Sequence, residues 1–191
     1  MAYLSAEKVS YLGFKSVGFN VLISDKASFY GADKISIGNN VRIDDFCILS
    51  ATGGEFVIGN YIHIAAYSSI IGAERVDILD FCNISSRVSI YSSSDDYSGM
   101  SMTNPMVPAM YKNVHTAGVV IGRHVIVGCG SVVLPGVKID DGSAIGALSL
   151  VYSNCEAHGI YGGIPARYIK NRNLEIFELE KKFLSVTRSE I

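Results

Sequence analysis

The chain has 191 residues, a formal net charge of −2 at pH 7 and charged side chains at only 18% of its positions. This balance excludes the broad basic surface of a nucleic-acid-binding protein, so we expect no nucleic-acid partner. No basic start followed by an apolar run marks a signal peptide, and no apolar stretch approaches the ~18 residues of a membrane span. The cysteines Cys47, Cys82, Cys129 and Cys155 form no CxxC pair, which favours a reduced, cytoplasmic setting.

The N-terminal segment, residues 1–19, is expected to be a helical lead-in to the main domain. Residues 5–12 favour one short helix, and Gly13 ends it because glycine is a poor helix former. The segment precedes the pattern that dominates the rest of the chain.

Residues 20–170 carry a repeat of period six, in which an aliphatic residue is followed four positions later by a small or aliphatic one. A helix has a period of about 3.6 and a lone strand a period of about two, so neither produces this pattern. A short strand plus a turn, repeated, does: three units close one triangular coil, and coils stack through parallel backbone pairing. The aliphatic positions are Ile37, Ile43, Leu49, Ile58, Ile64, Ile70, Ile78, Ile84, Ile90, Ile121, Val127, Val133, Ile139, Ile145 and Val151.

The remaining positions of each unit predict where its side chains point. Cys47, Cys82 and Cys155 fall on inward positions, so we interpret them as core thiols. The Gly, Asn and Asp residues of units such as IGNNVR and IDDFCI suit the corners, where a positive φ is needed.

Residues 95–118 interrupt the period. Their Gly99, Pro105 and Pro108 predict a long excursion loop that leaves one corner and returns to it. Long loops in compact domains are often functional, so this segment is a candidate part of a site.

The C-terminal segment, residues 171–191, is expected to hold an amphipathic helix over 173–185. Apolar residues stand there near helical spacing, at Leu174, Phe177, Leu179, Phe183 and Leu184. We expect this helix to cover one end of the solenoid or a neighbouring subunit.

The hexad pattern resembles the left-handed parallel β-helix of the hexapeptide-repeat acyltransferases, over nearly the whole chain. The resemblance implies a mainly β fold and its left hand, which the period alone does not give. It also implies a homotrimer with active sites between neighbouring prisms. Outward aromatic residues would fit such an interface, or they wedge against adjacent coils; they are Phe46, Tyr61, Tyr67, Phe81 and Tyr91.

Several runs resemble one subgroup, the nucleotide-sugar N-acyltransferases of the anthrose type. They are SVGFNVLIS (16–24), ISIGNNVRIDDFCILS (35–50), HIAAY (63–67), DFCNISSR (80–87), DDYSG (95–99) and YKNV (111–114). The resemblance implies acyl transfer from acetyl-CoA or another acyl-CoA to the 4-amino group of dTDP-4-amino-4,6-dideoxyglucose, for surface polysaccharide synthesis. It places the two residues that meet the sugar amine at Ser85 and Asp95.

This chemistry does not need the His base that many hexapeptide acyltransferases use, and the start of the excursion, Ser92 to Asp96, has no His. A model α-amine has a pKa of about 7.7–8, so an appreciable neutral fraction exists near neutral pH. Asp95 can then accept the amine proton while Ser85 fixes the direction of attack. The alternatives are a solvated Asp turn and a corner serine.

Further residues are candidates for substrate binding, namely His63, Asn83, Asp96, Tyr111 and His115. His63 is alternatively an outward side chain between coils or at a subunit interface, and His115 a loop surface residue. We expect His124 and His158 to be structural, and we predict no metal site.

The run GGIPAR (162–167) resembles the segment that ends the solenoid in CoA-using members. Pro165 fixes a turn, and Arg167, Lys170 and Arg172 can meet the anionic ADP part of CoA, unless they form a solvated face. Gly128, Gly146 and Ala147 lie on successive coils and are predicted to form the narrow groove for the pantetheine arm.

Three other functions compete with N-acylation. An O-acetyltransferase acting on a saccharide or antibiotic would need a stronger base, His115 or His63. A zinc enzyme of the γ-carbonic-anhydrase kind needs three converging His ligands, and the chain lacks an H-x4-H pair. The run GGIPAR and the polar excursion argue against a third alternative, a non-enzymatic scaffold or binding module.

Overall fold

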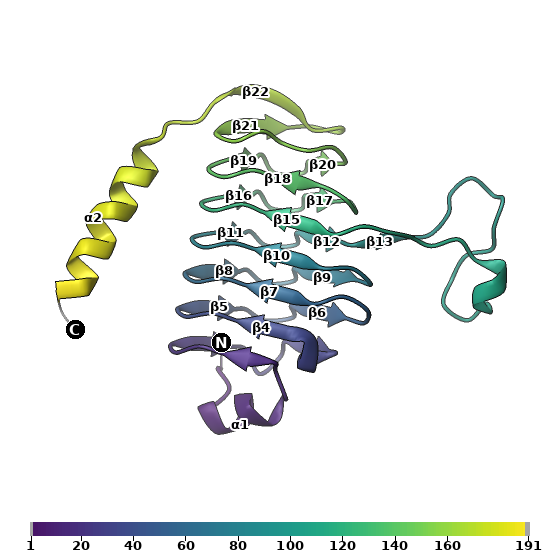
Figure 1. Ribbon diagram of the computed structural model, residues 1–191, viewed down its shortest axis with the longest axis horizontal. Coiled ribbons are helices and arrows are strands. Elements are labelled where there is room, and N and C mark those ends of the chain that lie inside the picture. The colour runs from purple at the N-terminus through teal and green to yellow at the C-terminus, as the bar shows by residue number, and fades with distance from the viewer. Residues whose placement is uncertain (1, 190–191) are drawn as a thin grey trace.

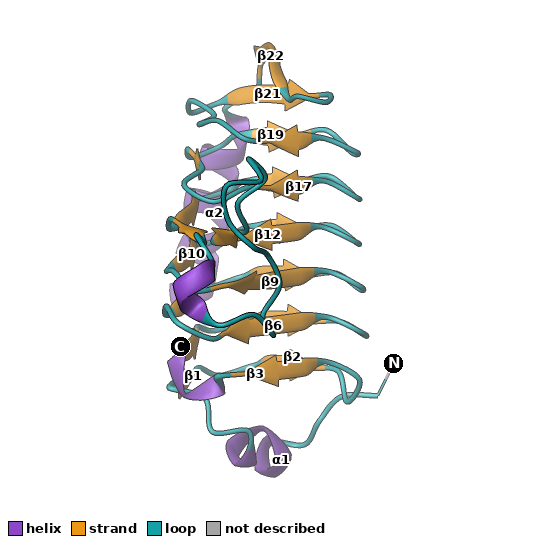
Figure 2. Ribbon diagram, turned by 90° about the vertical axis from the view of Figure 1, so that its right-hand side faces the viewer, coloured by secondary structure: helices purple, strands orange, loops and turns teal. Residues whose placement is uncertain are grey.

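The computed structural model describes residues 2–189 and shows a single parallel β-solenoid, consistent with the left-handed β-helix implied by the resemblance. Its coils stack one above another, with a short helix below the first coil (Figure 2). The hexad aliphatic residues all point inward, and each is at most 3% exposed. Cys47, Cys82 and Cys155 are buried among them, as predicted.

Three parallel sheets form the faces of the prism. The first face comprises β1 (Ser16–Val17), β4 (Ile35–Ile37), β7 (Phe56–Ile58), β10 (Val76–Ile78), β15 (Val119–Ile121) and β18 (Lys138–Ile139). The second comprises β2 (Val21–Ile23), β5 (Val41–Ile43), β8 (Ile62–Ile64), β11 (Asn83–Ile84), β16 (Ile126–Val127), β19 (Ala144–Ile145), β21 (Gly159–Gly162) and the antiparallel β22 (Arg167–Asn171). The third comprises β3 (Ser28–Tyr30), β6 (Ile48–Ala51), β9 (Ser69–Gly72), β12 (Ser89–Tyr91), β17 (Val132–Val133) and β20 (Leu150–Val151).

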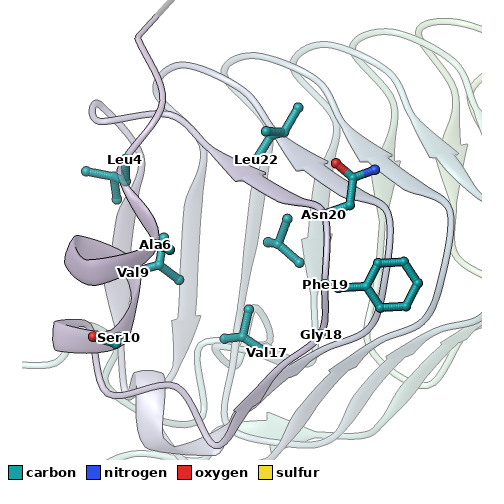
Figure 3. A pocket seen from close by; sticks show the side chains of 10 residues that line it. Leu4, Ala6, Val9, Ser10, Val17, Gly18, Phe19, Asn20 and Leu22 are labelled. Atoms are coloured by element: carbon teal, nitrogen blue, oxygen red, sulfur yellow. The ribbon is translucent and has the colours of Figure 1, made fainter.

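The N-terminal helix α1 (Ala6–Tyr11) begins after Ser5, whose hydroxyl accepts a hydrogen bond from the Lys8 amide. It ends before Gly13, which has a φ of +72°. A cleft of about 510 Å³ lies between α1 and the first coil, and Figure 3 shows its side chains. The lining is mostly apolar and includes Val9, Phe19 and Leu22, with no titratable side chain, so this cleft offers no group for acid–base chemistry.

At the corner between the first and second faces, here called the helix corner, the expectation of Asn and Gly at positive φ is confirmed only in part, at Asn20, Asn40 and Gly142. Each coil places one residue with positive φ at this corner, and together these residues form a column that also includes aromatic side chains. The column is Asn20, Asn40, Tyr61, Phe81, His124, Gly142 and His158. The Asn or Asp residue that precedes several of them joins neighbouring coils through its side chain. Its side-chain oxygen accepts the backbone N–H of the coil below, as Asp80 does from Asn60 at 2.7 Å. The same pattern recurs at Asn39, Asn60 and Asp141.

The C-terminal helix α2 (Glu175–Ser189) runs alongside this corner rather than over an end of the solenoid, which corrects the first of the two predicted placements (Figure 1). Cover of a neighbouring subunit stays a prediction. Phe177 packs edge-on between His124 and His158, at centroid distances of 5.1 and 5.3 Å. Phe183 packs in the same way on Tyr61 at 5.2 Å. The helix therefore follows a stack of corner side chains from coil to coil.

Two of the outward aromatic residues are consequently covered within the chain. Tyr61 stacks on Phe81 at 4.8 Å, and α2 packs over both rings, so they do not form the exposed interface that we considered. Phe46 and Tyr67 stack on each other at 4.9 Å but remain 45% and 53% exposed. Within residues 2–189, no helix combines the length and apolar character that crossing a membrane requires.

Candidate active site

Ser85 stands at the corner between the second and third faces, here called the serine corner, directly after β11. Its N–H donates to the Val127 carbonyl of the next coil at 3.0 Å. The same N–H to carbonyl hydrogen bond recurs once per coil, so the residues that donate it form a column. Above Asp44, every member of this column is small, namely Ala65, Ser85, Gly128 and Gly146. The Ser85 side chain is half-buried.

Asp95 stands on the excursion, here called the arm, which leaves the corner between the third and first faces. Its stem is an antiparallel pair of β13 (Ser93–Ser94) and β14 (His115–Thr116), in which Ser94 pairs with His115. The arm projects well away from the prism (Figure 1). Asp95 is exposed where the stem ends, and its neighbour Asp96 accepts a hydrogen bond from the Ser98 amide at 2.8 Å.

The arm also carries the other residues predicted there. The Ser98 amide is the largest of the influences that lower the pKa of Asp96. Tyr111 lies in the 3-10 turn η2 (Ala109–Tyr111) and lines a cleft of about 430 Å³ within the arm. His115 is exposed on β14. Asp95, Asp96, Tyr111 and His115 therefore belong to one projecting unit.

Ser85 and Asp95 are not brought together within one chain. The third-face strand β12 runs between them, and the segment Val88–Ser92 at about 3.3 Å per residue spans roughly 15 Å. A single sugar amine cannot touch both side chains across that face. The site that the sequence predicts is therefore incomplete in the single chain.

A polar network lies on the second face below Ser85. Arg42, His63 and Asn83 are in register on β5, β8 and β11. The imidazole Nε2 of His63 lies 2.9 Å from Asp44 Oδ2, and its Nδ1 lies 3.1 Å from Asn83 Oδ1. Arg42 Nε donates to the other carboxylate oxygen of Asp44 at 2.7 Å, and this contact raises the pKa of Arg42.

Asp44 was missed by the sequence analysis, although it belongs to the quoted run VRIDD. The signal is its position in the repeat, because it directly follows β5, one coil below His63. Its side chain is only 7% exposed, whereas the His63 side chain is 38% exposed. A buried carboxylate therefore supports a half-exposed imidazole on the face that carries Asn83 and adjoins Ser85.

Gly128 and Gly146 both lie in the serine corner, but only Gly128 is required for the stacking of the coils. A Cβ on Gly128 would lie 2.5 Å from the Ala147 amide nitrogen, so coil stacking alone requires glycine there. A Cβ on Gly146 would meet the Tyr161 carbonyl at 3.4 Å, an ordinary contact. Gly146 and Ala147 are exposed, so the corner above Ser85 is open to a ligand.

Basic residues stand at the upper end of this column. Gly162 follows Gly146 on the next coil and pairs with Arg167 on β22. Arg167 donates to the Tyr152 hydroxyl at 3.1 Å and remains exposed, as does Lys170. Pro165 lies in the exposed turn between β21 and β22.

Arg172 is directed elsewhere than predicted. Its Nη1 lies within 3.1 Å of the carbonyl oxygens of His124, Gly142 and Ser143, and burial lowers its pKa. It thus anchors the chain leading into α2 and is turned away from the ligand groove.

His124 and His158 contribute to packing, and three of the cysteines are buried while Cys129 is exposed. His124 is 5% exposed and bonds to Glu180 at 2.8 Å, so it is structural, and His158 packs against Phe177. Burial raises the pKa of Cys82 to about 12, whereas Cys129 is exposed beside Gly128 in the serine corner. Across residues 2–189, no three His, Cys, Asp or Glu side chains converge as metal ligands would.

Comparisons with known proteins identify relatives of this chain. The model of the family described as "Bacterial transferase hexapeptide (six repeats)" matches residues 118–153. The dTDP-4-amino-4,6-dideoxy-D-glucose acyltransferase of Escherichia coli is 60% identical over 96% of this chain and 95% of its own. A putative lipopolysaccharide biosynthesis O-acetyl transferase, WbbJ of E. coli K12, is 28% identical over 91% of this chain and 87% of its own.

Solved structures give the same result. AntD, an N-acyltransferase from Bacillus cereus, superposes with a TM-score of 0.93 and 48% identity, over 97% of this chain and 98% of its own, in complex with dTDP and 3-hydroxybutyryl-CoA. A serine-substituted AntD in complex with dTDP-4-amino-4,6-dideoxyglucose and coenzyme A gives the same TM-score, identity and coverage. With this fold and these relatives, the chain belongs to the dTDP-4-amino-4,6-dideoxyglucose acyltransferase family of hexapeptide-repeat proteins.

Proposed function

We propose that this protein transfers an acyl group from acyl-CoA to the 4-amino group of dTDP-4-amino-4,6-dideoxyglucose. The substrates named for its relatives support the choice of both reactants. The observation that carries the proposal is the column of small residues in the serine corner. It leads from Arg167 past Gly162, Gly146 and Gly128 to the hydroxyl of Ser85.

This column suits an extended acyl-CoA. Arg167 at its upper end would meet the anionic ADP part, because guanidinium groups bind phosphate oxygens well. The exposed backbone of Gly146 lets the pantetheine arm lie close to the coils, so the thioester would arrive near Ser85. Lys170 adds a second positive charge at the upper end.

The reaction is an attack by the neutral amine on the thioester carbonyl. The nitrogen forms the new C–N bond, and the carbonyl π electrons move to oxygen. Asp95 accepts a proton from the nitrogen, and Ser85 orients the amine for attack. The intermediate then expels the CoA sulfur, which takes up the proton, so the products are an amide and the free thiol of CoA.

We propose further that the protein is a trimer whose sites combine Ser85 of one copy with Asp95 of the next. The third face supports this, because the outward positions of its described strands carry no charged side chain. They are Ser28, Tyr30, Ile48, Ser50, Ser69, Ile71, Ser89, Tyr91, Val132 and Leu150. The first face, in contrast, presents Asp77 and Lys138.

The geometry of the corners fits the same assembly. The third face has the serine corner at one edge and the arm corner at the other. If three copies turn this face toward a common axis, each serine corner lies against the next arm. A closed cyclic assembly of this kind repeats the same contact three times. It brings to one place the two residues that a single chain keeps apart.

We place the reaction in the cytoplasm. Cys47, Cys82, Cys129 and Cys155 are all free thiols in the structure. A reducing compartment keeps such thiols unpaired, which supports this placement.

The test mixes the protein with acetyl-CoA and dTDP-4-amino-4,6-dideoxyglucose and follows thiol release. We expect release only when the amino sugar is present, and a rate lower by about 100-fold in Asp95→Ala. A dTDP sugar with a 4-hydroxyl group in place of the amine is the matched control. Release with the hydroxyl sugar alone, and its loss in a His63→Ala, His115→Ala double variant, would establish the O-acetyltransferase alternative.

A further inference from the structure

Asp44 is the one buried carboxylate in the polar network of the second face. Its Oδ2 lies 2.9 Å from His63 Nε2, and its Oδ1 accepts the Arg42 Nε–H at 2.7 Å. Each oxygen of the carboxylate therefore has its own partner. Because the carboxylate can only accept, it requires that Nε2 of His63 carries a hydrogen.

With a hydrogen fixed on Nε2, the ring has two remaining states, in which the other nitrogen, Nδ1, either carries a hydrogen or does not. Nδ1 of His63 lies 3.1 Å from Asn83 Oδ1. If Nδ1 carries a hydrogen, Asn83 accepts it and turns its NH₂ group away from the ring. If Nδ1 carries none, Asn83 must donate to it and presents its carbonyl oxygen outward instead. The state of the His63 ring therefore decides which end of the Asn83 amide faces outward.

Asn83 is close to the proposed chemistry. It lies on β11, and one inward residue, Ile84, separates it from Ser85, which directly follows the strand. The alternation about Ile84 turns both side chains outward. In the proposed assembly this is where the amino sugar lies. An amide with a fixed orientation can distinguish a donor from an acceptor on the sugar ring, whereas a freely rotating amide cannot.

We propose that Asp44 is a positioning residue for the nucleotide-sugar site, acting through His63 on Asn83. It holds the His63 ring with Nε2–H toward itself, and the ring in turn sets the Asn83 amide beside Ser85. This inference rests on the proposed function. It assigns Asp44 no contact with the substrate, and Asp44 takes no part in holding acyl-CoA, which lies on the coils above.

The test compares Asp44→Asn with Asp45→Asn in steady-state kinetics with both substrates. Asp45 stands at the same corner, but its carboxylate accepts from the Ser24 hydroxyl and pairs with Lys26, so it does not face His63. We expect Asp44→Asn to raise KM for the amino sugar about tenfold and to leave KM for acetyl-CoA unchanged. Asp45→Asn should change neither value.

A structural role alone would give a different result. Equal rises of both KM values in Asp44→Asn, or the same rise in Asp45→Asn, would mean that the corner has merely loosened and would overturn the inference. Wild-type kinetics in Asp44→Asn would also overturn it. If Asp44→Asn does not fold, His63→Gln takes its place. Gln has no counterpart of the Nδ1 atom that orients Asn83, so this variant should show the same selective rise in KM for the amino sugar.

Wild-type turnover separates this inference from the proposed function. Transfer by the wild type together with unchanged kinetics in Asp44→Asn would overturn the inference alone. No transfer by the wild type to any amino sugar nucleotide, from acetyl-CoA or longer acyl-CoAs, would overturn the proposed function and this inference with it.

Discussion

The ring of Phe177 occupies the space that a side chain at Gly142 would fill. A Cβ built on Gly142 would lie 2.7 Å from Nδ1 of His158 and 3.0 Å from both Cε2 and Cζ of Phe177. Gly142 is the one described member of the helix-corner column above Asn20 that lacks a side chain, between His124 and His158. The corner thus has a notch in its stack of side chains, and α2 places one aromatic ring in it.

Filling this notch should release α2 from the solenoid. Asn tolerates the positive φ of +69° at Gly142, so Gly142→Asn keeps the corner but adds a side chain where Phe177 packs. We expect a loss of about 1–3 kcal/mol in stability and faster proteolysis within α2. The matched control is Gly136→Asn, with a φ of +82° and only an ordinary 3.4 Å contact to Ala117. Equal proteolysis of the two variants would contradict this packing account.

Widening the side chain at Gly146 should weaken acyl-CoA binding without harming the fold. A Cβ there meets nothing in the chain closer than 3.4 Å, so Gly146→Val can fold while its methyl groups enter the proposed groove. We expect KM for acetyl-CoA to rise about tenfold or more, with the unfolding midpoint nearly unchanged. An unchanged KM for acetyl-CoA would place the donor elsewhere than the serine corner.

Cys129 provides a chemical probe of the same groove. It is exposed beside Gly128, whereas burial raises the pKa of Cys47 to about 11 and so suppresses its reactive thiolate. We expect iodoacetamide to modify Cys129 first in the folded protein. Saturating acetyl-CoA should slow this reaction, and dTDP alone should not. Peptide mass spectrometry reads both rates, and labelling of Cys129 that ignores acetyl-CoA would count against the groove.

Alkaline pH should destabilise the fold through its buried groups. Burial raises the pKa of Cys82 to about 12 and that of Cys155 to about 11, and it also raises the pKa of Tyr161. A free thiol titrates near ~8.5, so the folded state favours the protonated thiols. Their contribution is complete below about pH 8.5 and is lost as pH rises toward 11–12.

The unfolding temperature should therefore fall between about pH 9 and 11. Cys82→Ala lowers the midpoint at neutral pH, because a small cavity forms, but it should flatten the pH dependence. Cys129→Ala is the control, since its exposed thiol is not buried by folding. An identical slope in the wild type and Cys82→Ala would show that thiol burial is not the cause.

The coil architecture could be predicted from the sequence because burial imposes it directly. Ile64, Ile84 and Val127 occupy the inward position on successive coils, and the stacked coils bury all three. The arm could be predicted as well, because residues 95–118 cannot continue the hexad. The fold therefore follows from the spacing of apolar residues.

The site was only partly predictable, since it depends on which coil lies above which. Ser85 and Asp95 were identified by resemblance, but their separation by β12 needs the corner assignments. The pairing of Asp44 with His63 joins one coil to the next, so neither unit read alone indicates it and only the positions in the repeat do. Likewise, the apolar residues of α2 predict a packed face but do not indicate that Phe177 meets Gly142.

In the proposed trimer, one site uses Ser85 from one copy and Asp95 from the next. The direct measurement co-expresses Ser85→Ala and Asp95→Ala chains with different tags, purifies the mixed assemblies and measures thiol release with acetyl-CoA and the amino sugar. If the residues act across the interface, one site of each mixed trimer combines an intact Ser85 with an intact Asp95, so about a third of the sites regain both groups and activity rises well above either parent. Activity no higher than the mean of the two parents would contradict the account.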